Sequence, residues 1–208
     1  MSVLSLPPRV RARFFSRSIL SLFLTCAAAH VAAQDFQVAG IAVAEHTRLA
    51  GKQLLLNGTG VRRLYGFRVY VASLYLAEPA RAANQILEHD VPRRLQLVLL
   101  RDTTTEQNLD ALKEGLSDNN SAAELDAIKP EVAHFLGLIQ QVHEVPSGTE
   151  IQLDYLPGKG TYTRIGNRDL GLVPGERFNR ALLKIWLGDN PIQLTLKRSL
   201  LGLEGPTL

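Results

Sequence analysis

The segment Asn57–Arg63 holds the residues of this sequence best suited to bind a small anion. It reads Asn-Gly-Thr-Gly-Val-Arg-Arg and precedes the apolar segment Phe67–Leu76, which contains Tyr70. Guanidinium groups present a rigid fork of donors that suits a carboxylate or enolate oxygen. The glycines allow a tight backbone where one predicted strand ends. An arginine at position Arg62 or Arg63 can point into the gap between sheet and helices, and the Tyr70 hydroxyl could share the same anion.

The same residues also have a purely structural interpretation. Arg62 and Arg63 would then be solvated turn residues, while Tyr70 and Tyr75 would be core aromatic residues with satisfied hydroxyl groups. Residue composition alone favours this second interpretation and leaves the anion site open.

Familiar catalytic and cofactor motifs are absent or incomplete. Gly58-Thr59-Gly60 begins like a dinucleotide loop, but Arg63 stands at the third glycine position and a strand is expected to follow. Gly158-Lys159-Gly160 lacks phosphate-loop spacing and suits a hairpin turn. No G-x-S-x-G or H-E-x-x-H motif occurs. We expect no cofactor and no metal site, although ligation of a metal or haem by a single histidine stays open.

The first 33 residues have the pattern of a secretory signal peptide. Four arginines, with no acidic residue, precede the short apolar run Ile19–Thr25 and the small-residue segment Cys26–Ala33. The apolar run is shorter than the roughly 20 residues that span a bilayer. We expect cleavage near Gln34 and action in the periplasm or as a secreted protein, with a working domain of residues 34–208.

Charge and cysteine content narrow the function classes. The chain has 23 basic and 20 acidic residues, and four basic residues lie in the leader. Residues 34–208 therefore carry 19 basic against 20 acidic side chains, a net charge of −1, which argues against nucleic acid as a partner. Cys26 is the only cysteine, so the mature domain has no disulfide. No apolar run after the leader approaches membrane-spanning length, so we expect no transmembrane segment.

The order of predicted elements is strands, then helices, then strands. The strong strand signal at Phe67–Leu76 is apolar on both faces, which is typical of a covered central strand. Ser121 and Glu124 form a capping-box pattern, and Pro130 should either kink the helix that follows or divide it into two. The other strands are expected at 36–44, 52–61, 94–100, 149–155, 161–165 and 169–173, and the other helices at 80–87, 103–119, 174–187 and 195–201. An α+β fold, with an antiparallel sheet covered by helices, fits this order.

Three separated motifs resemble the chalcone isomerase superfamily, and specifically its bacterial secreted chalcone-isomerase-like branch. They are Leu56–Arg62 with Phe67–Leu76, Ile151–Thr161, and Val173–Gly175 with Ala181–Pro191, and together they extend over nearly all of residues 34–208. The resemblance implies an open-faced β-sandwich in which a large antiparallel sheet and a helical layer enclose a ligand cleft.

The resemblance assigns roles to two residues. Arg62 matches the arginine that holds the reacting oxygens in the plant enzymes, which close a chalcone to a flavanone. Tyr70 stands where those enzymes have a threonine that polarises the ketone. The fatty-acid-binding members of the superfamily instead use an arginine and a tyrosine to hold a carboxylate, and Arg62 with Tyr70 is similar to that pair. If the register differs by one residue, Arg63 replaces Arg62.

Three functions remain, in descending order of preference. The first is non-catalytic binding of a fatty acid or similar amphipathic carboxylate by Arg62 or Arg63 with Tyr70. The second is an interaction domain of the cell envelope with a vestigial cleft. The third is an intramolecular lyase or isomerase of the chalcone isomerase type, in which Arg62 would be catalytic.

Overall fold

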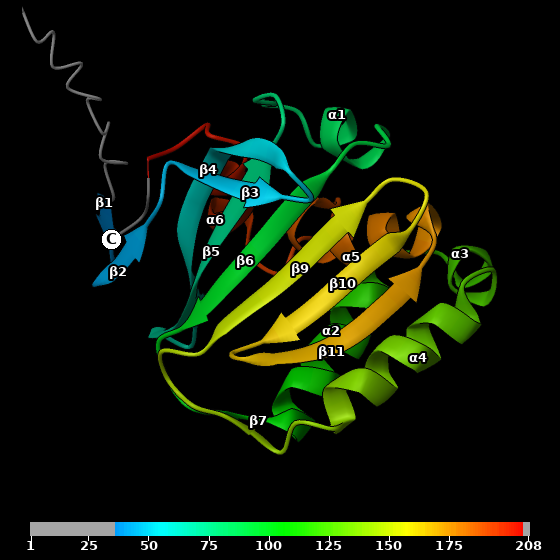
Figure 1. The fold of residues 1–208 in the computed structure, drawn as a ribbon. Helices are drawn as coiled ribbons and strands as arrows, with labels where there is room; N and C mark the ends of the chain where they lie inside the picture. The colour runs from blue at the N-terminus through cyan, green and yellow to red at the C-terminus, as the bar shows by residue number, and fades with distance from the viewer. Residues whose placement is uncertain (1–35, 206–208) are drawn as a thin grey trace, which may run out of the picture. The chain divides into compact units, whose positions relative to one another are not determined.

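A seven-stranded antiparallel sheet forms the centre of the protein in a computed structural model, which describes residues 36–205 (Figure 1). The strand order across the sheet is β11-β10-β9-β6-β5-β4-β3, and all neighbours pair antiparallel. The bounds are β3 His46–Leu49, β4 Lys52–Leu64, β5 Phe67–Leu76, β6 Arg93–Leu99, β9 Glu150–Leu156, β10 Gly160–Ile165 and β11 Arg168–Pro174.

Helices cover one face of this sheet. In Figure 1, α2 and α5 lie behind the strands and α4 runs beside β11. The bounds are α1 Ala83–Leu87, α2 Thr105–Asn119, α3 Ala122–Asp126, α4 Lys129–Gln140, α5 Glu176–Leu187 and α6 Leu194–Leu200, and the short strands β7 Thr103–Thr104 and β8 Glu144–Val145 pair beside α2. The main apolar core lies between sheet and helices. The expected α+β fold, with one large antiparallel sheet and a helical layer, is confirmed.

Alternation along the strands decides which side chains enter this core. Along β6, every second residue from Arg93 to Leu99 is buried. Strand β5 is buried on both faces from Tyr70 onward, as a central strand should be. The Ser121–Glu124 capping box is present, and Pro130 lies in the first turn of α4. The chain therefore divides into α3 and α4 at the expected place, because proline lacks the amide hydrogen that a helix interior needs.

One strand prediction and one helix prediction need correction at turns. The apolar segment 36–44, expected as one strand, is a hairpin of β1 (Phe36–Val38) and β2 (Ile41–Val43). Its turn places Ala39 at φ 51° and Gly40 at φ 86°, and nothing in an apolar pattern marks an alanine for that conformation. Pro174, expected to open a helix, instead ends β11, and Gly175 at φ 90° turns the chain into α5.

The glycines of the Asn57–Arg63 segment do not end a strand, because β4 continues through them to Leu64. A side chain at Gly58 would overlap backbone oxygens of Ser199 and Leu200 in α6, and one at Gly60 would come within 2.8 Å of the Ser199 Cβ. These glycines are required by the close approach of α6 to the sheet. The expectation of a tight strand-ending turn there is wrong.

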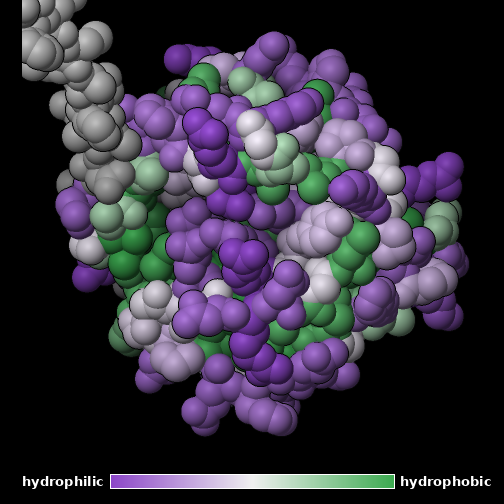
Figure 2. Space-filling model, in the orientation of Figure 1, coloured by the Kyte–Doolittle hydropathy of each residue, from purple (hydrophilic) through white to green (hydrophobic). Residues whose placement is uncertain are grey.

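The opposite face of the sheet carries smaller clusters. Val61 and Val71 pack beneath β1 and β2, and Tyr75 packs with Leu49 and Leu54. Figure 2, in the orientation of Figure 1, shows this side as mainly hydrophilic, with separate hydrophobic patches. Within residues 36–205, no helix is long and apolar enough to cross a lipid bilayer. The signal peptide expected in residues 1–33 lies outside the described residues.

Candidate functional site

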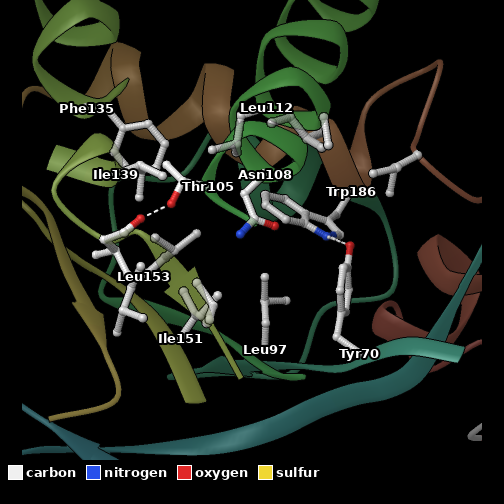
Figure 3. A pocket seen from close by; sticks show the side chains of 16 residues that line it. Tyr70, Leu97, Thr105, Asn108, Leu112, Phe135, Ile139, Ile151, Leu153 and Trp186 are labelled. Atoms are coloured by element: carbon white, nitrogen blue, oxygen red, sulfur yellow. Dashed lines mark hydrogen bonds between the residues drawn. The ribbon is translucent and has the colours of Figure 1, made fainter. Parts of the chain in front are cut away.

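An apolar cavity of about 100 Å³ lies between the helix-covered face of the sheet and helices α2, α4 and α5 (Figure 3). Strands β5, β6, β9 and β10 form its floor because their alternation turns aliphatic residues toward the helices. Sixteen side chains line it, and Tyr70 is the only ionisable one among them. Its apolar wall includes Leu97, Leu112, Phe135, Ile139, Ile151 and Leu153.

Tyr70 supplies the hydroxyl group at one end of this cavity. The indole Nε1 of Trp186 in α5 donates a hydrogen bond of 3.0 Å to the Tyr70 oxygen, as Figure 3 shows. Indole nitrogen is a donor only, so the hydroxyl hydrogen is not used in this bond. No described residue accepts that hydrogen. A buried hydroxyl with a hydrogen to donate is suited to a ligand oxygen.

Burial sets the protonation state of Tyr70. Loss of solvent raises the pKa of Tyr70 to about 12, although the Trp186 hydrogen bond and the charge of Arg62 act in the opposite direction. At neutral pH the group is therefore a neutral hydrogen-bond donor. It is poorly suited to act as a general base.

Arg62 lies beside Tyr70 because β4 and β5 pair these two residues directly, so both side chains lie on the same side of the sheet. The Arg62 side chain is half-buried but does not line the cavity. Its Nη1 donates to the Arg63 carbonyl and, at 3.3 Å, to Oε1 of Gln193. The structure thus brings Arg62 and Tyr70 together, with the arginine held at the margin of the cavity.

Arg63 has a different position. The pairing of β4 with β5 shifts between Arg62 and Arg63, which faces Arg68 across the hairpin. The backbone N–H of Arg63 donates to Oε1 of Gln193 at 2.8 Å. Arg62 is therefore the direct cross-strand neighbour of Tyr70. Arg63, the alternative to Arg62 in the predicted anion site, is not paired with Tyr70.

Gln193, in the segment between α5 and α6, contacts β4 at the margin of the cavity. Its side chain bonds Arg62 and Arg63, and its Nε2 donates to the Val61 carbonyl at 3.3 Å. The preceding residue, Ile192, lines the cavity and its N–H donates to the Ile185 carbonyl at 2.8 Å. The segment therefore contacts the cavity through Ile192 and Arg62 through Gln193.

Sequence reasoning missed Asn108 and Gln193. Asn108 projects from α2 into the cavity in Figure 3, and its Nδ2 donates to Thr103 Oγ1 at 3.1 Å. A signal existed, because Thr105, Asn108 and Leu112 follow helical spacing and therefore lie on one face of the helix expected at 103–119. Thr105 itself is satisfied by the carbonyls of Val142 and His143. Gln193 had no signal, because its partners on β4 are 130 and more positions distant.

The arrangement can hold an amphipathic molecule with one polar end. Tyr70 and Asn108 offer polar contacts, Arg62 contributes positive charge, and the remaining wall is largely apolar. No acid–base pair lines the cavity, since Tyr70 is its one ionisable group. Within residues 36–205, no cluster of three or more His, Cys, Asp or Glu side chains could hold a metal ion.

Comparison with known proteins places the fold. The chain resembles the crystal structure of an Arabidopsis thaliana fatty-acid binding protein with a TM-score of 0.61 and 16% sequence identity, over 78% of this chain and 92% of that one. At this identity the likeness shows the fold. No curated protein matches the sequence. A sequence model described as chalcone isomerase-like matches residues 34–202. Because that match extends over most of the chain, the protein belongs to the chalcone isomerase-like family.

Proposed function

We propose that the protein binds a fatty acid or a similar amphipathic carboxylate without transforming it. The tail occupies the apolar cavity, and the carboxylate accepts the Tyr70 hydroxyl hydrogen beside the charge of Arg62. One observation carries the proposal: a buried, protonated tyrosine with an unused hydrogen lies at the end of an apolar cavity and directly beside an arginine.

The energetics favour a carboxylate over a neutral head group. Hydrogen bonds to charged groups contribute about 1.5–3 kcal/mol, roughly twice the value of neutral ones. Each buried methylene of the tail adds about 0.8 kcal/mol. The Tyr70 pKa of about 12 keeps the donor hydrogen in place while the ligand carboxylate is ionised. The relative of known structure, described as a fatty-acid binding protein, supports the same ligand class.

The size of the cavity adds a requirement. Its volume of about 100 Å³ is small beside the ~300–1,000 Å³ of typical small-molecule sites. We propose that the Ile192–Gln193 segment moves outward when a long tail enters. That movement breaks the Gln193–Arg62 hydrogen bond and lets the guanidinium turn toward the carboxylate.

The proposal is tested by native mass spectrometry with lipid extraction, followed by calorimetric titration of the delipidated protein with saturated fatty acids of increasing length. Wild type should carry or take up a fatty acid. Tyr70→Phe and Arg62→Gln should each lower affinity at least tenfold, because each removes a charge-assisted contact. Tyr75→Phe and Arg63→Gln are the matched controls and should bind as wild type does.

Different outcomes point to different functions. An empty wild-type protein that takes up no fatty acid would overturn the proposal. Turnover of a chalcone that depends on Arg62 would favour an intramolecular isomerase, despite the lack of a second ionisable group in the cavity. Equal losses in Arg63→Gln and Arg62→Gln would show that Arg62 has no special role.

The proposed place of action is outside the cytosol, and this rests on the leader-like residues 1–33 alone. Expression of the full chain followed by cell fractionation should give an exported product that begins near Gln34. A product that keeps residues 1–33 and remains in the cytosol would contradict the proposal.

A further inference from the structure

The hairpin that joins β4 to β5 ends in exposed apolar side chains. Tyr65 is 90% exposed and Phe67 is 64% exposed, and the adjacent Leu64 is 45% exposed. We call residues Leu64–Phe67 the hairpin tip. Contiguous large apolar side chains at a protein surface indicate a contact with another apolar medium, whereas single ones need no explanation.

The backbone of the hairpin tip makes this tyrosine more notable. Tyr65 has φ 50° and Gly66 has φ 83°, so both central residues of the turn are left-handed. Such turns favour Asn-Gly or Asp-Gly, because a bulky side chain is strained at positive φ. Tyr65 therefore stands where the turn itself would prefer a small polar residue. The conformation of the turn does not explain a tyrosine here, and its exposed ring is available to contact another molecule.

Positive charge surrounds the tip. Arg63 and Arg68 flank it in sequence, and the Arg101 guanidinium lies over the Phe67 ring, 5.3 Å from its centroid. No acidic residue occurs between Glu45 and Glu78. Asp102 follows Arg101 in the sequence, accepts a hydrogen bond from the Ser147 N–H at 2.8 Å and offsets one of these positive charges. The hairpin tip thus complements a negatively charged surface.

One more exposed apolar side chain follows the residue that contacts this hairpin. Leu194, the first residue of α6, is 63% exposed. It follows Gln193, which bonds both Arg62 and the Arg63 N–H. Tyr65 is three residues beyond Arg62, roughly 10 Å along an extended chain. The hairpin tip therefore lies close to the segment proposed to open the cavity.

We propose that the hairpin tip, together with Leu194, docks the protein on a lipid bilayer that carries anionic head groups. Tyr65 and Phe67 enter the interfacial layer, where aromatic side chains are favoured, and Arg63, Arg68 and Arg101 contact the head groups. A protein partner fits less well, because a stable interface buries about 1,000 Å² or more and a four-residue tip offers far less. Docking goes beyond the proposed ligand binding and brings the cavity next to a source of lipid.

Flotation with vesicles tests the docking directly. The purified protein should bind vesicles of phosphatidylcholine and phosphatidylglycerol in equal parts, and bind phosphatidylcholine vesicles more weakly. Tyr65→Asn with Phe67→Thr should weaken binding at least tenfold, and both replacements suit their backbone positions. Arg68→Gln with Arg101→Gln should weaken it about fivefold per arginine and reduce its salt dependence. Val91→Ser removes an exposed apolar side chain beyond the far end of β6 and is the control.

The outcomes separate docking from ligand binding. In titrations without vesicles, both double variants should take up fatty acid as wild type does, whereas Arg62→Gln should lose fatty acid and keep vesicle binding. Wild type that does not bind anionic vesicles would overturn the inference, as would vesicle binding that survives both double variants. A dimer that the Tyr65→Asn, Phe67→Thr variant abolishes, without vesicle binding, would overturn it in favour of a second copy of the chain.

Discussion

Each face of the sheet carries a buried tyrosine from β5 and an arginine from β6, which is buried on the helix-covered face and partly buried on the outer face. The hydrogen bonds of these residues differ between the two faces. On the outer face, the Tyr75 hydroxyl donates to the Ala44 carbonyl at 3.1 Å. On the helix-covered face, the Tyr70 oxygen only accepts, from Trp186, and its hydrogen has no acceptor among the described residues. The same residue type is thus a structural contact on one face and an available donor on the other.

The two arginines show the same contrast. Arg94 binds Asp154 through two hydrogen bonds of 2.6 and 2.7 Å and also donates to Thr47 at 2.7 Å, and the Asp154 bond raises its pKa. Arg93 is 2% exposed, bonds Asn179 and two carbonyls without a carboxylate, and burial lowers its pKa. Its Nη2 has no partner among the described residues. Incomplete polar pairing is thus found on the face that carries the cavity.

The largest expected effect concerns the ion pair of the outer face. Asp154→Ala should lower the free energy of unfolding by about 3 kcal/mol, because it leaves the charge of Arg94, whose side chain is only 11% exposed, without its partner. Urea denaturation measures the loss. Replacing both residues, Arg94→Met with Asp154→Leu, should recover most of it. A loss below about 1 kcal/mol for Asp154→Ala would show that the outer face does not depend on this pair.

Close packing of the helical layer gives the next effect. Gly58→Ala should destabilise the protein by about 2–3 kcal/mol, since the new Cβ would lie 2.7 Å from the Leu200 carbonyl oxygen and even closer to Ser199. The contacted atoms belong to the backbone and cannot move by changing a side-chain rotamer, so α6 itself must shift. Gly51→Ala is a control without neighbouring atoms, although its φ of 80° adds strain of its own. Thermal unfolding that is unchanged in Gly58→Ala would contradict the close approach of α6 to β4.

Alkaline pH should act mainly on the helix-covered face. The folded-state pKa of Tyr70 is raised to about 12 against 10 for an unburied tyrosine. The stability that depends on its protonated form is therefore complete below pH 10 and lost between pH 10 and about 12, by about 2–3 kcal/mol. Because phenylalanine does not titrate, the difference in stability between wild type and Tyr70→Phe should be constant below pH 10, and wild type should then lose about 2–3 kcal/mol relative to the variant as the pH rises to 12. Parallel curves would rule out a strongly buried Tyr70.

The smallest effect comes from the matched tyrosines. Tyr75→Phe should cost about 1 kcal/mol through the lost part-buried bond to Ala44, and Tyr70→Phe about 1–2 kcal/mol, because it leaves the buried Trp186 N–H without its acceptor. Denaturation curves of the two variants give both values. Fatty-acid affinity should fall only in Tyr70→Phe. An equal loss of affinity in Tyr75→Phe would remove the proposed difference between the two faces.

Much of the fold could be predicted because it depends on local patterns. The alternation of Phe67–Leu76 predicted β5 with its observed bounds, and Pro130 predicted a kink or division where α3 and α4 separate. Failures came where a turn lacked a marker, as at Ala39, or where a glycine served packing instead of a turn, as at Gly58. Local patterns report backbone preference, and they do not report which distant segment lies above a strand.

The candidate site also combines features that local patterns predict with features that depend on distant contacts. Local patterns were enough to predict the α+β class and to single out Arg62 and Tyr70, because strand alternation and residue chemistry do not depend on distant contacts. Tertiary structure alone decided that β4 and β5 pair Arg62 with Tyr70, that Trp186 and Asn108 join the cavity, and that Gln193 holds the arginine at its margin. Those contacts join segments far apart in the chain. They exist because burial of the shared apolar core brings the helical layer onto the sheet.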